Sequence, residues 1–255
     1  MESTDPKLVS CVMATRDRRQ FIPQALRCFL RQSYKNSELI IVDDGKESVA
    51  DLCQGLPRVH HIQLHRPVPT GTKLNIAIKR AHGDILQKLD DDDYYHPDFL
   101  KLALDRLPSR ACERTLVAWD CFLVLFAGEA YLRHAGHGWQ AGGTFCFHRK
   151  LWQRKPFRDV VKDEDNWLLC DHRPRILRVC AAEYYILVRH GRNTWQYLTD
   201  GGADSYFRTL PPYEKPLEAL VPAEDLMFYR SLAFSTQGGR WQPRIGGAGG
   251  AITGK

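Results

Sequence analysis

Residues 9–45 read VSCVMATRDRRQFIPQALRCFLRQSYKNSELIIVDDG, and this stretch decides the fold. Apolar runs at residues 8–15 and 38–42 have the length and composition of buried strands. Between them, residues 21–34 carry apolar side chains at helical spacing, and Pro23 falls in the first turn, where proline is tolerated. A strand, a helix and a strand in this order predict a βαβ unit and a parallel sheet.

The same alternation continues as far as Pro108, after which the pattern changes. Before this proline we expect further strands at residues 59–64 and 84–89 and helices at residues 72–81 and 97–107. After it we expect strands at 116–126, 142–147 and 183–189, a helix at 224–234 and a glycine-rich tail from residue 238. The fold class is therefore α/β, with a mostly parallel sheet flanked by helices.

Composition excludes several classes of protein. The 255 residues are 44% hydrophobic and 26% charged, which is ordinary for a globular chain and unlike a disordered protein, a collagen or a coiled coil. A net charge of +6 permits an anionic ligand but does not indicate nucleic acid binding. The most apolar stretch, residues 116–127, is too short to cross a bilayer and contains Asp120. Because the N-terminal residues are also polar, we expect no membrane span and a cytoplasmic location.

Eight cysteines are spread along the chain, and no two of them form a CxxC pair. Most lie in apolar surroundings, where a free cysteine behaves as a small hydrophobic residue. We therefore expect reduced, buried cysteines rather than a disulfide framework or a zinc site.

Acidic residues follow two of the expected strands: Asp43 and Asp44 after the second, and the run 90–93, DDDD, after the fourth. Carboxyl ends of parallel strands lie at one edge of a sheet, so the two groups can converge. Four adjacent carboxylates repel one another, and a divalent cation would relieve that repulsion. The alternative is a solvated acidic turn in which Asp93 caps the next helix.

Taken in order, these segments resemble family 2 glycosyltransferases over about residues 8–107. The resemblance rests on residues 9–45 together with residues 69–100, PTGTKLNIAIKRAHGDILQKLDDDDYYHPDFL. It implies a GT-A fold, a Rossmann-like sheet with a C-terminal acceptor-binding portion. It also implies three regions: a nucleotide-sugar-binding half at 1–108, an acceptor-binding and catalytic half of the same domain at 109–237, and a flexible tail at 238–255.

For the donor, the resemblance implies that Thr15 and the backbone around Ala14 touch the nucleotide base. Asp44 would hydrogen-bond the base, with uracil favoured over guanine or thymine. Lys73 lies in the segment that meets the base or the diphosphate. The family's usual TYN is here Thr15-Arg16-Asp17, so that Arg16, like the arginines after it, either contacts phosphate or is solvated.

For the chemistry, the resemblance implies a DxD motif that works with Mn²⁺ or Mg²⁺. Asp90 would face the ribose, Asp91 would occupy the variable middle position, and Asp92 would bind the metal. His190 would lie near the metal or the diphosphate. Asp165 would be the catalytic base.

The identity of that base stays open, because Asp163 and Glu164 adjoin Asp165 and the three could simply form the acidic first turn of a helix. The residue types fit the reaction independently, since a cation neutralises the leaving diphosphate and a carboxylate accepts the proton of the attacking hydroxyl.

The function that follows is metal-dependent, inverting transfer of one sugar from a nucleotide-diphosphate sugar to an acceptor hydroxyl. The acceptor could be a small molecule, a glycan or a peptide. The QxxRW motif of processive synthases is absent, and so is the glycine-rich phosphate loop of nucleotidyltransferases. The remaining alternative is a catalytically degenerate module of this fold that binds a nucleotide or a protein partner.

Overall fold

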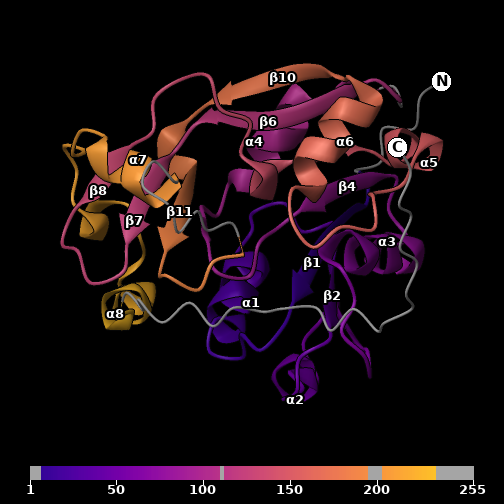
Figure 1. The fold of residues 1–255 in the computed structure, drawn as a ribbon, viewed down its shortest axis with the longest axis horizontal. Coiled ribbons are helices and arrows are strands. Elements are labelled where there is room, and N and C mark those ends of the chain that lie inside the picture. The colour runs from indigo at the N-terminus through magenta and orange to yellow at the C-terminus, as the bar shows by residue number, and fades with distance from the viewer. Residues whose placement is uncertain (1–6, 110–111, 195–202, 234–255) are drawn as a thin grey trace, which may run out of the picture.

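The computed structural model describes residues 7–109, 112–194 and 203–233, which form two sheets and the helices around them (Figure 1). The larger sheet has the spatial order β10 (Arg175–Cys180), β6 (Thr115–Cys121), β9 (Cys146–His148), β4 (Ile85–Lys88), β1 (Val9–Thr15), β2 (Ser37–Asp43) and β3 (Val59–Gln63). Neighbouring strands run parallel except at β9, which is antiparallel to both β4 and β6. The expected mostly parallel α/β sheet is confirmed.

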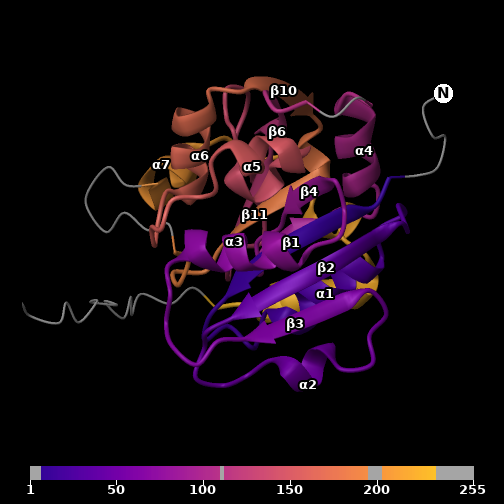
Figure 2. The ribbon, with the colours of Figure 1, turned by 90° about the vertical axis from the view of Figure 1, so that its right-hand side faces the viewer.

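Alternate side chains of the central strands pack on opposite faces of this sheet. From β1, Cys11 and Met13 join a buried cluster with α1 (Ile22–Leu30) and α4 (Phe99–Arg106). Val12 points the other way and joins a second cluster. The helices of that second cluster are α3 (Thr70–Arg80), α5 (Arg149–Arg154) and α6 (Glu164–His172). Helices thus cover both faces, and Figure 2 shows α2 (Ala50–Cys53) beyond the β3 edge.

The smaller sheet shows where the sequence prediction was wrong. It has the order β5 (Tyr94–Tyr95), β11 (Tyr185–Arg189), β7 (Leu123–Phe126) and β8 (Leu132–His134). The single strand expected at 116–126 is two strands, because β6 ends at Cys121 in the larger sheet and β7 begins at Leu123 in the smaller one. The register of β6 against β10 shifts at this point, and such a bulge bends a strand.

Other differences lie in the second half of the chain. The strand expected at 142–147 begins as a 3₁₀ turn, η1 (Gly142–Thr144), and only then becomes β9. Glu164 and Asp165 lie in the first turn of α6 and Asp163 is its N-cap, as the helical alternative expected, while the choice of the base among them stays a prediction. The expected terminal helix is α8 (Ala223–Ser231), preceded by α7 (Ala203–Thr209). The tail predicted from residue 238 lies outside the described residues.

Strands from both sides of residue 108 share the larger sheet, because β9 lies between β4 and β6.

Among the described residues, none of the helices combines the length and the apolar character needed to cross a bilayer.

Candidate functional site

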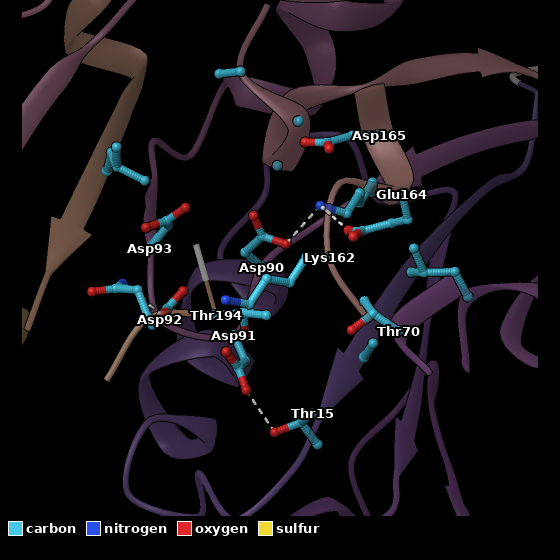
Figure 3. Close-up of a pocket in the computed structure, with 18 of the residues that line it drawn as sticks. Thr15, Thr70, Asp90, Asp91, Asp92, Asp93, Lys162, Glu164, Asp165 and Thr194 are labelled. Carbon is cyan, nitrogen blue, oxygen red and sulfur yellow. Dashed lines mark hydrogen bonds and ion pairs between the residues drawn. The ribbon is translucent and has the colours of Figure 1, made fainter. Parts of the chain in front are cut away.

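A cavity of about 830 Å³ opens at the carboxyl ends of β1 and β4. The β1 end contributes residues 14–18, the β4 end contributes residues 90–93, and the turn 138–143 and the start of α6 close the opposite side. This is the edge at which open α/β sheets bind ligands. Figure 3 shows the carboxylates of Asp90–Asp93 and of Asp165 around this space.

Most of the predicted site residues meet in this cavity. Eight line it: Ala14, Thr15, Arg16, Lys73, Asp90, Asp91, Asp92 and Asp165. The other two, Asp44 and His190, are buried one layer behind the lining. Asp44 accepts hydrogen bonds from Lys73 Nζ at 2.7 Å and from the Val68 amide at 2.8 Å. The roles assigned to these ten residues remain predictions.

The four consecutive aspartates point in different directions. Asp90 lies 3.0 Å from Lys88 Nζ, whereas Asp91 accepts the Thr15 hydroxyl at 2.6 Å. Asp93 accepts the Tyr185 hydroxyl at 2.5 Å and the Val188 amide at 2.9 Å, which joins the run to β11. Burial, followed by the charges of Asp92 and Asp90, raises the pKa of Asp93 well above its ordinary value. Asp93 therefore has a structural role at the back of the cavity.

Arg18, which the sequence left between phosphate contact and solvation, is not a solvated side chain, because it is largely buried against two of the aspartates at the cavity. Its Nη1 atom donates at 2.7 Å to Asp91 and also at 2.7 Å to Asp92, and its side chain is only 16% exposed. Burial raises the pKa of Asp92, but the Arg18 guanidinium and His190 lower it well below its usual range. For Asp91, burial outweighs Arg18 and the pKa is raised. The repulsion that suggested a cation is thus already partly relieved by the protein itself.

Lys88 makes a second cationic contact, which sequence reasoning missed. Its Nζ lies 3.0 Å from Asp90 and 3.3 Å from Glu164, so it joins the end of β4 to the start of α6. Burial alone would lower the pKa of Lys88, but the Asp90, Glu164 and Asp165 carboxylates raise it. The sequence feature that could have indicated this contact is a lysine at the end of an expected buried strand, two residues before Asp90.

Two consecutive glycines allow carboxylates to approach from two sides. A Cβ on Gly142 would lie 1.7 Å from Asp165 Oδ2, and a Cβ on Gly143 would lie 2.5 Å from Asp90 Oδ2. Neither carboxylate could keep its position beside a larger residue. The carboxylates of Asp90 and Asp165 therefore both pack against the turn η1, and both line the cavity (Figure 3).

The acidic residues fit a hard divalent cation, since Mg²⁺ and Mn²⁺ prefer carboxylate oxygens. Asp90 is the most accessible, with 36% of its side chain exposed. The three hydrogen bonds described for Asp92, from Arg18, His190 and Asn193, all go to Oδ2. His190 Nδ1 accepts a hydrogen bond from the Arg192 amide, and Nε2 donates to Asp92 Oδ2, so His190 contacts the acidic run through Asp92.

Comparisons with known proteins agree with this fold. Residues 10–124 match the family described as Glycosyl transferase family 2. The "Putative colanic acid biosynthesis glycosyl transferase WcaA" of Escherichia coli is 36% identical over 135 residues, 50% of this chain and 47% of that protein. The "Putative teichuronic acid biosynthesis glycosyltransferase TuaG" of Bacillus subtilis is 30% identical over 110 residues, 41% of this chain and 44% of that protein. The chain thus spans about half the length of the curated relatives it matches.

Solved structures extend the similarity of fold beyond residue 124. A mannosyltransferase from Pyrobaculum calidifontis, in complex with GDP-Man and Mn²⁺, superposes with a TM-score of 0.57 at 16% identity, over 74% of this chain and 59% of that chain. S. aureus TarS 1–349, in complex with UDP-GlcNAc, superposes with a TM-score of 0.54 at 16% identity, over 78% of this chain and 63% of that chain. The fold is the GT-A fold of glycosyltransferases. Residues 10–124 match glycosyl transferase family 2, the family that the sequence pattern resembles.

Proposed function

We propose that this protein transfers one sugar from a nucleotide-diphosphate sugar to an acceptor hydroxyl, with metal dependence and inversion at the anomeric carbon. One observation carries the proposal: the acidic run of the predicted DxD motif and the Asp165 carboxylate line one cavity and share the turn Gly142–Gly143. Such a cavity offers a cation site and a base, which are the two groups that a single displacement needs.

The donor would lie along the β1 and β4 ends. Lys73 Nζ donates to the Thr15 carbonyl oxygen at 3.0 Å and to Asp44 at 2.7 Å, so the predicted base-contacting residues form one connected group. Each oxygen of Asp44 has one described donor, and a carboxylate oxygen can accept a second hydrogen bond. Because the Asp44 side chain is fully buried beside Lys73, a uracil N–H would become that second donor only after Lys73 moves aside. Among the similar folds, TarS is found with UDP and UDP-GlcNAc, whereas the mannosyltransferase holds GDP-Man.

Asp90 and Asp92 would hold the cation, which when bound stabilises the charge that develops on the departing diphosphate. Arg18 and Lys88 lie beside these carboxylates and hold them in place. His190 orients Asp92 from behind, at 3.0 Å.

Asp165 would accept the proton of the acceptor hydroxyl. It lines the cavity, and one of its oxygens accepts only the adjacent Asn166 amide, at 2.8 Å, among the hydrogen bonds described. Glu164 is a weaker candidate, because it is buried against Lys88. A single displacement assisted by this base inverts the anomeric centre. We also propose a cytoplasmic location, since all eight cysteines are free thiols, as expected in a reducing compartment.

Thermal unfolding with UDP, GDP and dTDP, each with and without Mn²⁺, tests the donor site. A nucleotide at about one hundred times its Kd stabilises the fold by about 2.7 kcal/mol, which raises Tm by roughly 5–10 °C for a chain of this size. We expect a Mn²⁺-dependent shift with UDP that Asp92→Asn abolishes. A shift with no turnover of any donor would favour the degenerate binding module, and no shift with any nucleotide would contradict the proposal.

A further inference from the structure

We propose a zinc site, separate from the cavity, formed by Asp120, Cys121, His137 and Cys180. Asp120 and Cys121 end β6, Cys180 ends the neighbouring β10, and His137 comes from the segment that follows β8. One candidate ligand atom of each residue lies within 4.8 Å of those of the other three. Two thiols, an imidazole and a carboxylate are the ligand types that Zn²⁺ takes in tetrahedral sites.

Three kinds of distance between the ligand atoms are close to those around a tetrahedral ion, and the remaining pairs lie within 4.8 Å of each other. With Zn–S of about 2.3 Å, a tetrahedron places its two sulfurs about 3.8 Å apart, and a nitrogen and an oxygen ligand about 3.4 Å apart. The Cys121 and Cys180 sulfurs are 3.7 Å apart, and His137 Nδ1 is 3.4 Å from Asp120 Oδ2. Cys180 Sγ lies 3.8 Å from either ring nitrogen of His137, against about 3.6 Å in the ideal geometry. Small side-chain adjustments would complete the site.

An irregularity in strand pairing makes this set possible. Val179 pairs with Trp119, but the next residue, Cys180, pairs with Cys121, so that Asp120 is an extra residue in β6. Consecutive residues of a regular strand point to opposite faces, whereas a bulge redirects a side chain. The bulge therefore lets Asp120 and Cys121 serve one ion.

The second observation is a buried carboxylate oxygen without a partner. Asp120 is only 6% exposed, and its Oδ1 has no hydrogen-bond partner among the described residues. Its Oδ2 lies 3.4 Å from His137 and 3.8 Å from Arg178, and both of these side chains are at least half exposed. A buried carboxylate with an unpaired oxygen is costly, and a cation bound to the carboxylate through Oδ2 would supply the charge that balances it.

A disulfide between Cys121 and Cys180 would account for the closeness of the two sulfurs. It would not account for Asp120 and His137, whose ligand atoms lie beside them. It would also need the sulfurs to move from 3.7 Å to about 2.05 Å apart. The sequence predicted no zinc site because no two of its cysteines form a CxxC pair. Here the ligands come from three separate segments, and Cys180 is exposed rather than buried.

The ion would fix the turn 136–139, part of which lines the cavity. His137 lies between Gly136 and Gly138, which have φ values of +62° and +106°, and the Trp139 amide donates to the Asp120 carbonyl oxygen at 3.1 Å. Gly138 and Trp139 line the cavity. Binding would displace the two thiol protons and fix this turn, whether or not the cavity transfers a sugar.

Zinc content and cobalt spectroscopy test the site. The reduced protein is loaded with Zn²⁺, passed over a desalting column and analysed for bound metal. We expect about one zinc per chain in the wild type and in Cys170→Ser, which removes an exposed thiol on α6 as the matched control. Cys180→Ser and Asp120→Asn should each weaken zinc retention against a chelator by at least tenfold. Circular dichroism shows whether each variant is folded.

Co²⁺ distinguishes this site from the acidic run. Only thiolate ligands give a sulfur-to-cobalt charge-transfer band, so the wild type should show this band and Cys180→Ser should lose it. Failure of the wild type to retain zinc or to show the band overturns the proposal without bearing on nucleotide binding. A Cys121–Cys180 disulfide that forms in the presence of zinc, detected by mass spectrometry, would replace the site with a redox pair.

Discussion

Arg18 Nη1 lies 2.7 Å from Asp92 Oδ2, so the aspartate expected to bind the metal is already paired with a buried arginine. The same nitrogen contacts Asp91. The protein cation and an incoming divalent cation would therefore share these carboxylates, and their charges would oppose each other. This relationship makes the acidic run a weaker metal site than four aspartates would suggest.

Replacing Arg18 should strengthen metal binding. In Arg18→Gln the repulsion from the guanidinium is lost, and a single and a double positive charge about 5 Å apart at an effective dielectric constant of about 20 interact by roughly 7 kcal/mol. We expect Mn²⁺ to bind at least about tenfold more tightly in the absence of nucleotide, as measured by electron paramagnetic resonance titration. Arg19→Gln is the matched control, because Arg19 pairs with Glu47 and Asp51 instead. Unchanged or weaker binding in Arg18→Gln would contradict the assignment of Asp92 as a ligand.

Asp165→Asn should separate binding from transfer. Loss of the general base should lower the transfer rate by about 10²–10⁴-fold while the affinity for the donor nucleotide is kept. Glu164→Gln and Asp163→Asn, measured beside it for rate and nucleotide Kd, identify the base among the three neighbours. If Asp165→Asn also loses nucleotide binding, its role is structural; if Glu164→Gln alone loses transfer, the base is Glu164.

Gly142→Ala should reduce activity more than stability. Its new Cβ would meet the end of the Asp165 side chain at 1.7 Å, and this side chain can rotate away. We expect a loss of about 10²-fold in transfer, from a displacement of about 1 Å, and little change in Tm. Gly71→Ala gives the opposite case, because its Cβ would lie 1.9 Å from the Arg158 backbone oxygen. Backbone must then move, at a cost of about 1–3 kcal/mol. Equal Tm values for the two variants would refute this contrast.

Asp225 should contribute to stability in a pH-dependent way. This fully buried carboxylate accepts hydrogen bonds from Arg27 at 3.1 Å and Arg31 at 2.5 Å, and so fixes α8 on α1. Burial raises its pKa, but the hydrogen bonds and charge of Arg31, together with the hydrogen bonds of Gln24 and Arg27, outweigh burial and lower the pKa below its ordinary value. A lowered pKa in the folded state gives stability that is fully present above the unfolded pKa and is lost as pH falls through the folded value.

We therefore expect Asp225→Asn to lower the free energy of unfolding by about 1–3 kcal/mol at pH 7. The difference from wild type should stay constant down to about pH 4 and shrink below it. Urea unfolding at pH 7, 5, 4 and 3 measures this. Glu224→Gln, at the adjacent position with a 64% exposed side chain 3.5 Å from Arg31, should change stability by less than about 0.5 kcal/mol. A difference that grows as the pH falls would contradict the assignment.

Much of the fold could be predicted from local patterns. The four N-terminal strands and the helices α1 and α3 between them were expected within a few residues of their observed ends, because strand and helix periodicities are properties of neighbouring residues; the short helix α2 was not expected. The break at Phe122 was not predictable. Residues 116–126 are apolar except for Asp120, and the change of sheet depends on a bulge against β10, whose Cys180 lies 59 residues from Cys121 and which was itself not expected.

The sequence by itself determined that apolar strands end in acidic residues, and that parallel strands bring those ends to one edge. That was enough to predict that the run 90–93 lies at this edge, whereas Asp165, in the first turn of α6, was expected there only from the family resemblance; both line one cavity. Only the tertiary structure decided which charges those acids meet, because Arg18 and Lys88 reach them through contacts between segments distant in the chain. It likewise decided that Cys121 and Cys180 adjoin, since a strand register is set by the packing of whole elements and leaves no spacing signal in the sequence.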